Sequence, residues 1–266
     1  MKKQVQLGLV VEGNSGSSAV LRLPGLTEDL GPVKSGALRI ARRLSNMLRA
    51  GYAVAEYEEL QAARLILLSV PDTAVPRIVD ELCASELVLK DLSFVLCESW
   101  LTAGALEPLR TRGASVATLL GLPSTHPKWF MVEGQITAVR QTRRFLEDND
   151  VRTAEIRPGT KELYFAGELL ATALPMPLLV TAQQALRGSG LSGHHLSAVL
   201  EEMVQKLLRD FLKGARVSWG GPLTQALPET AETYFETLRR SRPEIAKVVD
   251  EQLPWARDRM KAKDPH

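Results

Sequence analysis

The stretch LILLSVPD at residues 65–72 contains the strongest strand signal in this chain. A continuous apolar run of this length, ended sharply by Pro71 and Asp72, is typical of a strand covered on both faces. The apolar run at residues 5–11 has the same character. Such strands belong to sheets that carry helices on each side, so the two runs favour an α/β fold.

Further strands and helices alternate outward from these two runs. Strands are predicted at residues 31–35, 93–97, 114–120, 129–133 and 151–156, and helices at residues 37–48, 76–87, 104–112 and 138–146. Because a helix between two strands must cross a face of the sheet, these strands are expected to pair in parallel. Residues 1–157 are therefore predicted to form one mostly parallel sheet domain.

Residues 158–266 show helical patterns only. The segment 161–186 is long and apolar, and the prolines within it should kink it. Residues 196–212 place apolar side chains at helical spacing and stop before Gly214, which predicts one helix with a wide apolar stripe. An all-helical carboxyl-terminal domain is expected here, and its apolar surface favours a homodimer formed through these helices.

Composition and charge favour a soluble protein in a reducing compartment. The 266 residues are 45% hydrophobic and 24% charged, and the net charge of +2 gives no reason to expect nucleic acid or an anionic membrane as a partner. No uncharged stretch approaches the roughly 20 residues of a membrane span. Glu12 interrupts the first apolar run too early for a signal peptide. Since Cys83 and Cys97 both lie within apolar patterns, a cytoplasmic location is expected.

A glycine-containing loop follows the first strand. The dinucleotide fingerprint GxGxxG uses its glycines for a tight turn and for close approach of backbone N–H groups to a pyrophosphate. Residues 11–17 read VEGNSGS, which keeps the second and third glycines and replaces the first by valine. The predicted phosphate contacts are Val11, Gly13, Asn14, Ser15, Gly16 and Ser17.

Two residues of this loop argue against phosphate binding. A β-branched residue such as Val11 resists a positive φ. Glu12, if it faced a pyrophosphate at about 4 Å, would repel it by roughly 1 kcal/mol in water and about 4 kcal/mol near a protein surface. The alternative is that Gly13 and Gly16 only form a strand-to-helix turn.

Cofactor contacts are also expected where two neighbouring strands end. Lys34 and Ser35 lie at the end of the second strand, which meets the adenine ribose in nucleotide-binding sheets. A cation there, backed by Arg39, suits the 2′-phosphate of NADP better than the ribose of NAD, although an ordinary surface lysine is an equal alternative. The remaining predicted contacts follow the strand at 65–70: Val70, Pro71 and Asp72.

Several segments taken together resemble a known family. LLSVPD at 67–72, followed by AVP at 74–76, resembles a segment of Rossmann proteins related to pyrroline-5-carboxylate reductase and the β-hydroxyacid dehydrogenases. Among them, the chain is most similar to two-domain, oxidoreductase-like bacterial proteins, on segments at 104–110, 113–116, 132–134, 161–164 and 221–224. The resemblance implies a Rossmann-type NAD(P)-binding domain, a dimerising helical domain, and chemistry between them near the carboxyl ends of the strands.

The chain departs from this family at most polar positions that could transfer a proton. Ser99 keeps one hydroxyl of a Ser-Ser-Gly segment, whereas Leu120, Phe165 and Ala173 replace two histidines and an asparagine. Lys161 and Tyr164 are the remaining catalytic candidates, three residues apart on one helix face.

Each remaining candidate has a functional and a structural alternative. Lys161 could protonate a developing alkoxide if burial lowered its pKa, and Tyr164 could orient the substrate. Alternatively, Lys161 is a surface residue of the first helical turn and Tyr164 packs in the core. Ser99 could bind the substrate or cap a turn. His194 and His195 point to different sides of a helix, without acidic or thiol neighbours, so no metal site is predicted.

Two functions remain open. One is an NAD(P)-dependent oxidoreductase that acts on a small carbonyl, imine or hydroxy-acid substrate at the interdomain cleft, with NADP or NAD as cofactor. The other is a catalytically degenerate Rossmann protein that binds a ligand or a protein partner without redox chemistry. The first rests on Gly13, Gly16, Ser99 and Lys161, and the second on Val11, Glu12, Leu120, Phe165 and Ala173.

Overall fold

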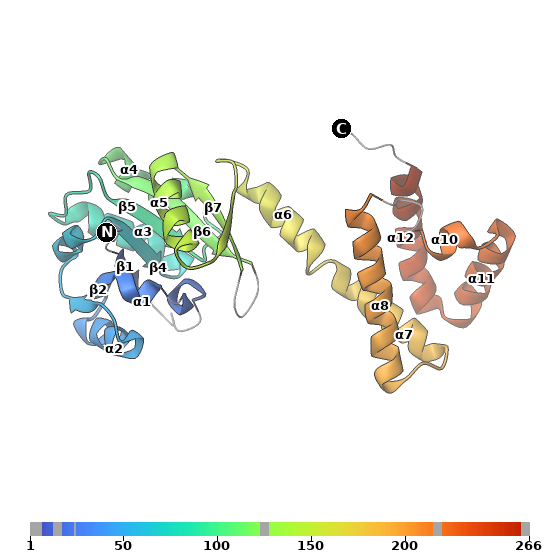
Figure 1. The fold of residues 1–266 in the computed structure, drawn as a ribbon. Coiled ribbons are helices and arrows are strands. Elements are labelled where there is room, and N and C mark those ends of the chain that lie inside the picture. The colour runs from blue at the N-terminus through green and yellow to red at the C-terminus, as the bar shows by residue number, and fades with distance from the viewer. Residues whose placement is uncertain (1–6, 13–17, 24, 123–127, 215–219, 262–266) are drawn as a thin grey trace. The chain divides into compact units, whose positions relative to one another are not determined.

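A computed structural model describes residues 7–12, 18–23, 25–122, 128–214 and 220–261 (Figure 1). Contacts within the chain divide it into two units, Met1–Ala166 and Gly167–His266. The sequence pattern places the boundary at residue 157, whereas this division falls inside a helix that begins at Lys161. Each unit is described by itself below.

The first unit is built on an eight-stranded sheet with the order β3-β2-β1-β4-β5-β6-β7-β8. All neighbouring strands pair in parallel except β6 and β7, which are antiparallel. The predicted Rossmann-type, mostly parallel sheet is confirmed. The strands are β1 (Leu7–Val11), β2 (Leu30–Ser35), β3 (Tyr52–Val54), β4 (Leu65–Ser69), β5 (Ser93–Cys97), β6 (Ser115–Gly121), β7 (Trp129–Gly134) and β8 (Arg152–Glu155).

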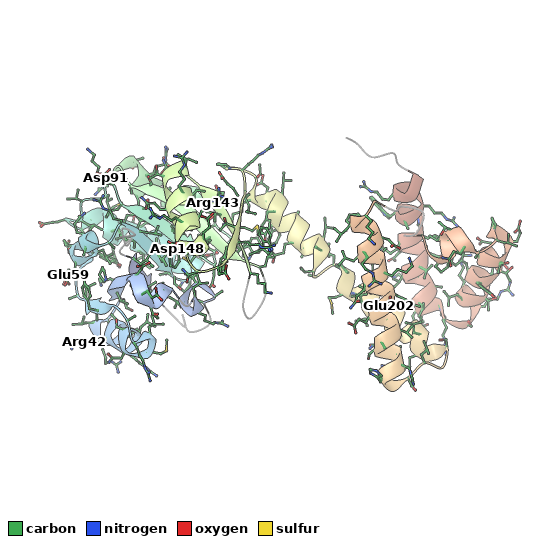
Figure 2. The ribbon with its side chains drawn as sticks, viewed as in Figure 1. Arg42, Glu59, Asp91, Arg143, Asp148 and Glu202 are labelled. Atoms are coloured by element: carbon green, nitrogen blue, oxygen red, sulfur yellow. The ribbon has the colours of Figure 1, made fainter. Side chains whose placement is uncertain are left out.

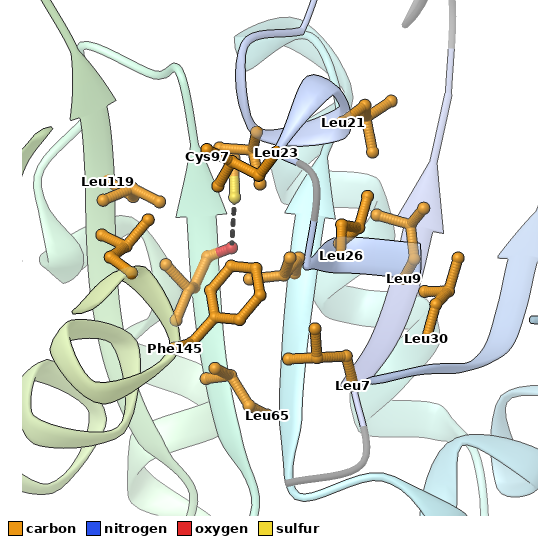
Figure 3. Packing of buried hydrophobic residues seen from close by; sticks show 14 of the residues in the cluster. Leu7, Leu9, Leu21, Leu23, Leu26, Leu30, Leu65, Cys97, Leu119 and Phe145 are labelled. Carbon is orange, nitrogen blue, oxygen red and sulfur yellow. Dashed lines mark hydrogen bonds between the residues drawn. The ribbon is translucent and has the colours of Figure 1, made fainter. Parts of the chain in front are cut away.

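Helices cover both faces of this sheet (Figure 1). Side chains of β4 alternate between two buried clusters: Leu65 and Leu67 pack in one, and Ile66 and Leu68 in the other. Figure 3 shows the first cluster, to which Phe145 of α5 (Ile136–Glu147) contributes its ring. The helical elements are η2 (Val20–Arg22), α1 (Leu26–Asp29), α2 (Leu38–Leu48), η3 (Tyr57–Ala62), η4 (Asp72–Ala74), α3 (Val75–Ala84), η5 (Ala103–Leu106), α4 (Glu107–Thr111) and α5 (Ile136–Glu147).

The charged side chains lie mainly outside these clusters. Arg42 on α2 and Arg143 on α5 extend from the exposed sides of their helices (Figure 2). Glu59 of η3 accepts hydrogen bonds from the backbone N–H groups of Ala55 and Glu56, at 2.8 and 3.1 Å, and so caps the start of that helix. Surface charge here serves solvation and capping.

The second unit contains helices only in the part of it that the structure describes, as the sequence predicts. They are the end of α6 (Lys161–Ala171), then α7 (Pro175–Gly188), α8 (Gly193–Leu212), α10 (Pro222–Gln225), α11 (Pro228–Ser241) and α12 (Pro243–Lys261). The apolar segment 161–186, expected as one kinked helix, is divided by turn residues 172–174 into α6 and α7. The expectation that no uncharged stretch approaches the length of a membrane span is wrong for this segment, because residues 169–186 carry no charged side chain. An 18-residue window within Lys161–Gly188 has a mean hydropathy of 1.6, so length and composition alone would allow it to cross a membrane.

Candidate functional site

The candidate site lies in the first unit, where parallel strands β1, β2, β4 and β5 end at the same edge of the sheet. Open α/β sheets bind their ligands at this edge. The residues that follow these strands are Glu12 after β1, Pro71 and Asp72 after β4, and Glu98 and Ser99 after β5.

The predicted phosphate loop is described at its flanks. Gly13, Asn14, Ser15, Gly16 and Ser17 lie outside the described residues. Val11 is the last residue of β1, is buried, and pairs in register with Ser35 and Ser69. Its backbone therefore belongs to the strand, so the valine at the first glycine position does not have to form the turn.

Glu12, at the start of this loop, contacts a side chain of another element. Its carboxylate forms an ion pair with the guanidinium of Arg77, on the first half of α3. A second guanidinium nitrogen of Arg77 lies 2.5 Å from Glu81, one turn further along α3. The hydroxyl of Tyr57 donates to the other oxygen of Glu81 at 2.8 Å. The acidic side chain that argued against phosphate binding is thus paired with a cation from another element, which it shares with Glu81.

Lys34 joins the same group of side chains at the end of β2. Its ammonium lies 4.7 Å from the centre of the Tyr57 ring, within reach of a cation–π interaction, and donates to the backbone oxygen of Ser35 at 2.9 Å. Ser35 itself is buried. The predicted 2′-phosphate cation therefore has a defined position at the carboxyl end of its strand.

The far flank of the loop carries a feature that the sequence did not reveal. Glu98, directly after β5, has a φ of +55°, and its carboxylate accepts a hydrogen bond from the backbone N–H of Ala19. The hydroxyl of Ser18 is buried and has no hydrogen-bond partner among the described residues. A ligand oxygen at this loop would supply the acceptor or donor that Ser18 lacks.

Lys161 is buried, with 2% of its surface exposed, although it begins a helix. Its ammonium donates to the backbone oxygens of Ser99 and Leu101, at 2.8 and 2.5 Å, and to the hydroxyl of Thr118 at 3.0 Å. Three acceptors match the three protons of an ammonium. The surface alternative for this residue is wrong, and the side chain holds the loop after β5 against β6.

Glu133 of β7 completes this buried group. Its carboxylate accepts hydrogen bonds from the Thr118 hydroxyl at 3.3 Å and from the backbone N–H of Ala103 at 2.9 Å. Burial lowers the pKa of Lys161 from 10.5 to about 8, and the negative charges of Glu133 and Asp72 oppose that shift. Glu133 was missed because only the antiparallel pairing of β6 with β7 brings it opposite Thr118.

Ser99 and Tyr164 lie close to this lysine. The hydroxyl of Ser99 accepts a hydrogen bond from the backbone N–H of Leu101 at 3.0 Å and so caps the turn after β5. The ring of Tyr164 stacks on Trp100 with centroids 6.0 Å apart, and Phe165 meets the same indole edge-on at 5.0 Å. The first turn of α6 thus surrounds the loop after β5 with one ammonium and two aromatic rings.

The two adjacent histidines belong to the second unit. His194 and His195 are exposed near the start of α8, with their rings 6.3 Å apart. Within the described part of the chain, no group of three His, Cys, Asp or Glu side chains is arranged to hold a metal ion.

Comparisons with known proteins bear on the fold. No protein-family model matches this chain, and no curated protein matches it in sequence. Among solved structures, a candidate NADP oxidoreductase from Bacteroides fragilis superposes with a TM-score of 0.74 at 11% identity, over 96% of this chain and 97% of that one. An imine reductase from Myxococcus stipitatus in complex with NADP+ gives 0.64 at 14% identity, over 96% and 94% of the two chains.

A pyrroline-5-carboxylate reductase from Coxiella burnetii is also similar, with a TM-score of 0.58 at 13% identity, over 98% of this chain and 100% of that one. The sequence resemblance to this group of Rossmann proteins is confirmed at the level of the fold. The likeness extends over nearly the full length of each chain.

Proposed function

We propose that this chain is an NAD(P)-dependent oxidoreductase that acts on a small carbonyl, imine or hydroxy-acid substrate. A fold alone does not determine an activity. The observation that carries the proposal is Lys161, a buried ammonium whose pKa of about 8 suits proton transfer, held beside the loop that ends β5. The proteins of similar fold, which are named as an NADP oxidoreductase and as two reductases, support the same proposal.

The residues present fit a dinucleotide at the ends of β1, β2 and β4. Gly13 to Ser17 would approach the diphosphate, and the hydroxyl of Ser18, which has no hydrogen-bond partner among the described residues, follows that loop. Lys34 and Ser35 would meet the 2′-phosphate of NADP, which is why we propose NADP rather than NAD. Val70, Pro71 and Asp72 would line the next strand end. When bound, the cofactor supplies or accepts the hydride.

Lys161 would hold the proton of the reaction. Below pH 8 its ammonium is charged and can give a proton to an alkoxide or amine that develops next to it. To do so it must exchange one of its three acceptors, of which Leu101 is the least buried. Tyr164 and Ser99 would help to orient the substrate.

The alternative, a Rossmann protein that binds a ligand without redox chemistry, also has an observation in its favour. The carboxylate of Glu98 already accepts the N–H of Ala19, at the helical turn after the phosphate loop. All three protons of Lys161 already have acceptors within the protein. Both groups would have to rearrange for catalysis.

We further propose that two copies of the chain associate through their carboxyl-terminal helices. In this proposal the protein is soluble and cytoplasmic, takes a small-molecule substrate, and has neither a nucleic-acid nor a membrane partner. The exposed apolar side chains of α7 and α8 support the homodimer.

Cofactor binding separates the two functions. Titration with NADPH and NADH, followed by thermal unfolding, should raise the stability by about 2.7 kcal/mol at a cofactor concentration 100 times Kd. Gly13→Asp should abolish the NADPH effect, because a new carboxylate enters the phosphate loop. Gly188→Asp, on α7 with open space around it, is the matched control and should leave the effect unchanged. No stabilisation at millimolar cofactor would contradict the oxidoreductase and favour the alternative.

A further inference from the structure

The ion pair between Glu12 and Arg77 joins the start of the phosphate loop to helix α3. Arg77 is the third residue of that helix, and Glu12 immediately precedes Gly13. The side chains are 49% and 36% exposed. An ion pair this exposed contributes little to folding stability. We therefore expect its effect on the charge at the start of the loop and not on folding.

Glu12 lies where its charge would act on an anionic ligand of the phosphate loop. A carboxylate at the entrance of a phosphate loop repels any anionic ligand that binds there. Arg77 offsets this charge and holds the side chain toward α3. Arg77 is in turn held by Glu81, and Glu81 by the hydroxyl of Tyr57, so the guanidinium is fixed on two sides. This chain of contacts directs the carboxylate of Glu12 toward α3.

We propose that Arg77 is a positioning residue for dinucleotide binding, which holds the carboxylate of Glu12 toward α3 and offsets its negative charge. The inference rests on the proposed function, because it presumes an anionic cofactor at this loop. The ligand chemistry is a diphosphate, and Arg77 acts on it through Glu12 without touching it.

A double-mutant cycle tests this role with the Kd of NADPH as the readout, measured on the full chain by calorimetry. Arg77→Gln frees the Glu12 carboxylate and should weaken NADPH binding about tenfold or more at low salt. Glu12→Gln should bind at least as tightly as the wild type. The double variant should return to within about threefold of Glu12→Gln, because no carboxylate is left to repel the cofactor.

Two further variants and the salt dependence sharpen the test. Arg77→Lys keeps the positive charge and should restore most of the affinity. Arg110→Gln breaks a similarly exposed ion pair with Glu107 on α4 and should leave Kd unchanged. The loss in Arg77→Gln should shrink as salt rises, since the repulsion is screened.

The outcomes separate the two proposals. The role of Arg77 would be overturned, and the proposed function kept, if the wild type binds NADPH and Arg77→Gln binds it equally well. The same conclusion would follow if the double variant binds NADPH as weakly as Arg77→Gln. A wild-type chain that does not bind NADPH would overturn the proposed function, and this inference with it. Thermal unfolding of each variant shows whether a loss of binding reflects a loss of folding.

Discussion

Lys161 is the most deeply buried charged residue in the described part of the first unit, which contains the sheet. A buried charge is tolerated when every donor has an acceptor and an opposite charge is near. Lys161 meets both conditions through Ser99, Leu101 and Thr118, with Glu133 beyond the threonine. The remaining desolvation still lowers its pKa to about 8. The free-energy cost of burying the charged form is measurable because it depends on pH.

The first prediction concerns stability and pH at Lys161. Its pKa is about 8 in the folded chain and 10.5 in the unfolded chain, so between these values the unfolded state binds more protons. Stability therefore rises with pH in this window, by about 3 kcal/mol in total. Lys161→Met lacks this titration. Urea unfolding should find the variant less stable by about 2 kcal/mol at pH 7, since it leaves buried acceptors unpaired, with the gap widening toward pH 10.

Parallel pH profiles for the wild type and Lys161→Met would contradict the lowered pKa. If the chain proves to be a reductase, the same residue gives a kinetic signature. A proton donor with a pKa of about 8 is active when protonated, so kcat/KM for reduction should fall above pH 8. This fall should be absent from the residual activity of Lys161→Met.

Only part of the site could be predicted residue by residue. Lys161, Tyr164 and Ser99 were found because a resemblance and a helix spacing pointed to them. Arg77, Glu98 and Glu133 were not, because each acts on a residue far away in the chain: Glu12, Ala19 and Thr118. A single sequence carries no signal for such pairs. The burial of Lys161 was likewise set by acceptors on other elements.

At the scale of elements, the strands buried on both faces were the easiest to predict. The strands at β4 and β5 follow from their apolar runs, since burial of every residue needs a continuous apolar sequence. By contrast, β3 has three residues, of which only Val54 is buried, and was not predicted. The helix expected at 104–112 proved to be a 3-10 turn followed by the short helix α4. Short elements depend on contacts rather than on periodicity.

The second prediction concerns Gly134, which ends β7 with a φ of +148°. A Cβ at this position would lie closer than 3.0 Å to the backbone of Val116 and Ala117 in β6. Backbone atoms in a paired strand cannot move aside, so Gly134→Ala should destabilise the chain by about 2–3 kcal/mol in urea unfolding.

Gly159→Ala separates the clash from the backbone strain. Gly159 also has a positive φ, of +77°, but nothing lies within 4 Å of its added Cβ. This variant should lose only about 1 kcal/mol. Equal losses in the two variants would mean that strain, and not the contact with β6, requires the glycine at 134.

At the scale of the molecule, the two units bury apolar surface very differently. The first unit, which contains the sheet, has two large buried apolar clusters. In the described part of the second, helical unit, the buried apolar side chains are Leu196, Ile245 and Ala246. Large apolar side chains of α7 and α8 are exposed, including Met176, Leu178, Val180, Met203, Leu207 and Leu208. A soluble monomer rarely leaves such a surface uncovered, which is the physical reason to expect a second copy on it.

The last prediction tests that association. Met203 and Leu207 lie one turn apart on α8 and are 53% and 50% exposed. The double variant Met203→Glu, Leu207→Glu places two charges on this stripe, so sedimentation at micromolar concentration should find a dimer for the wild type and a monomer for the variant. Gln205→Glu, on the opposite side of the same helix, should remain dimeric. A monomeric wild type would contradict the homodimer, and so would a double variant that stays dimeric with its helices intact.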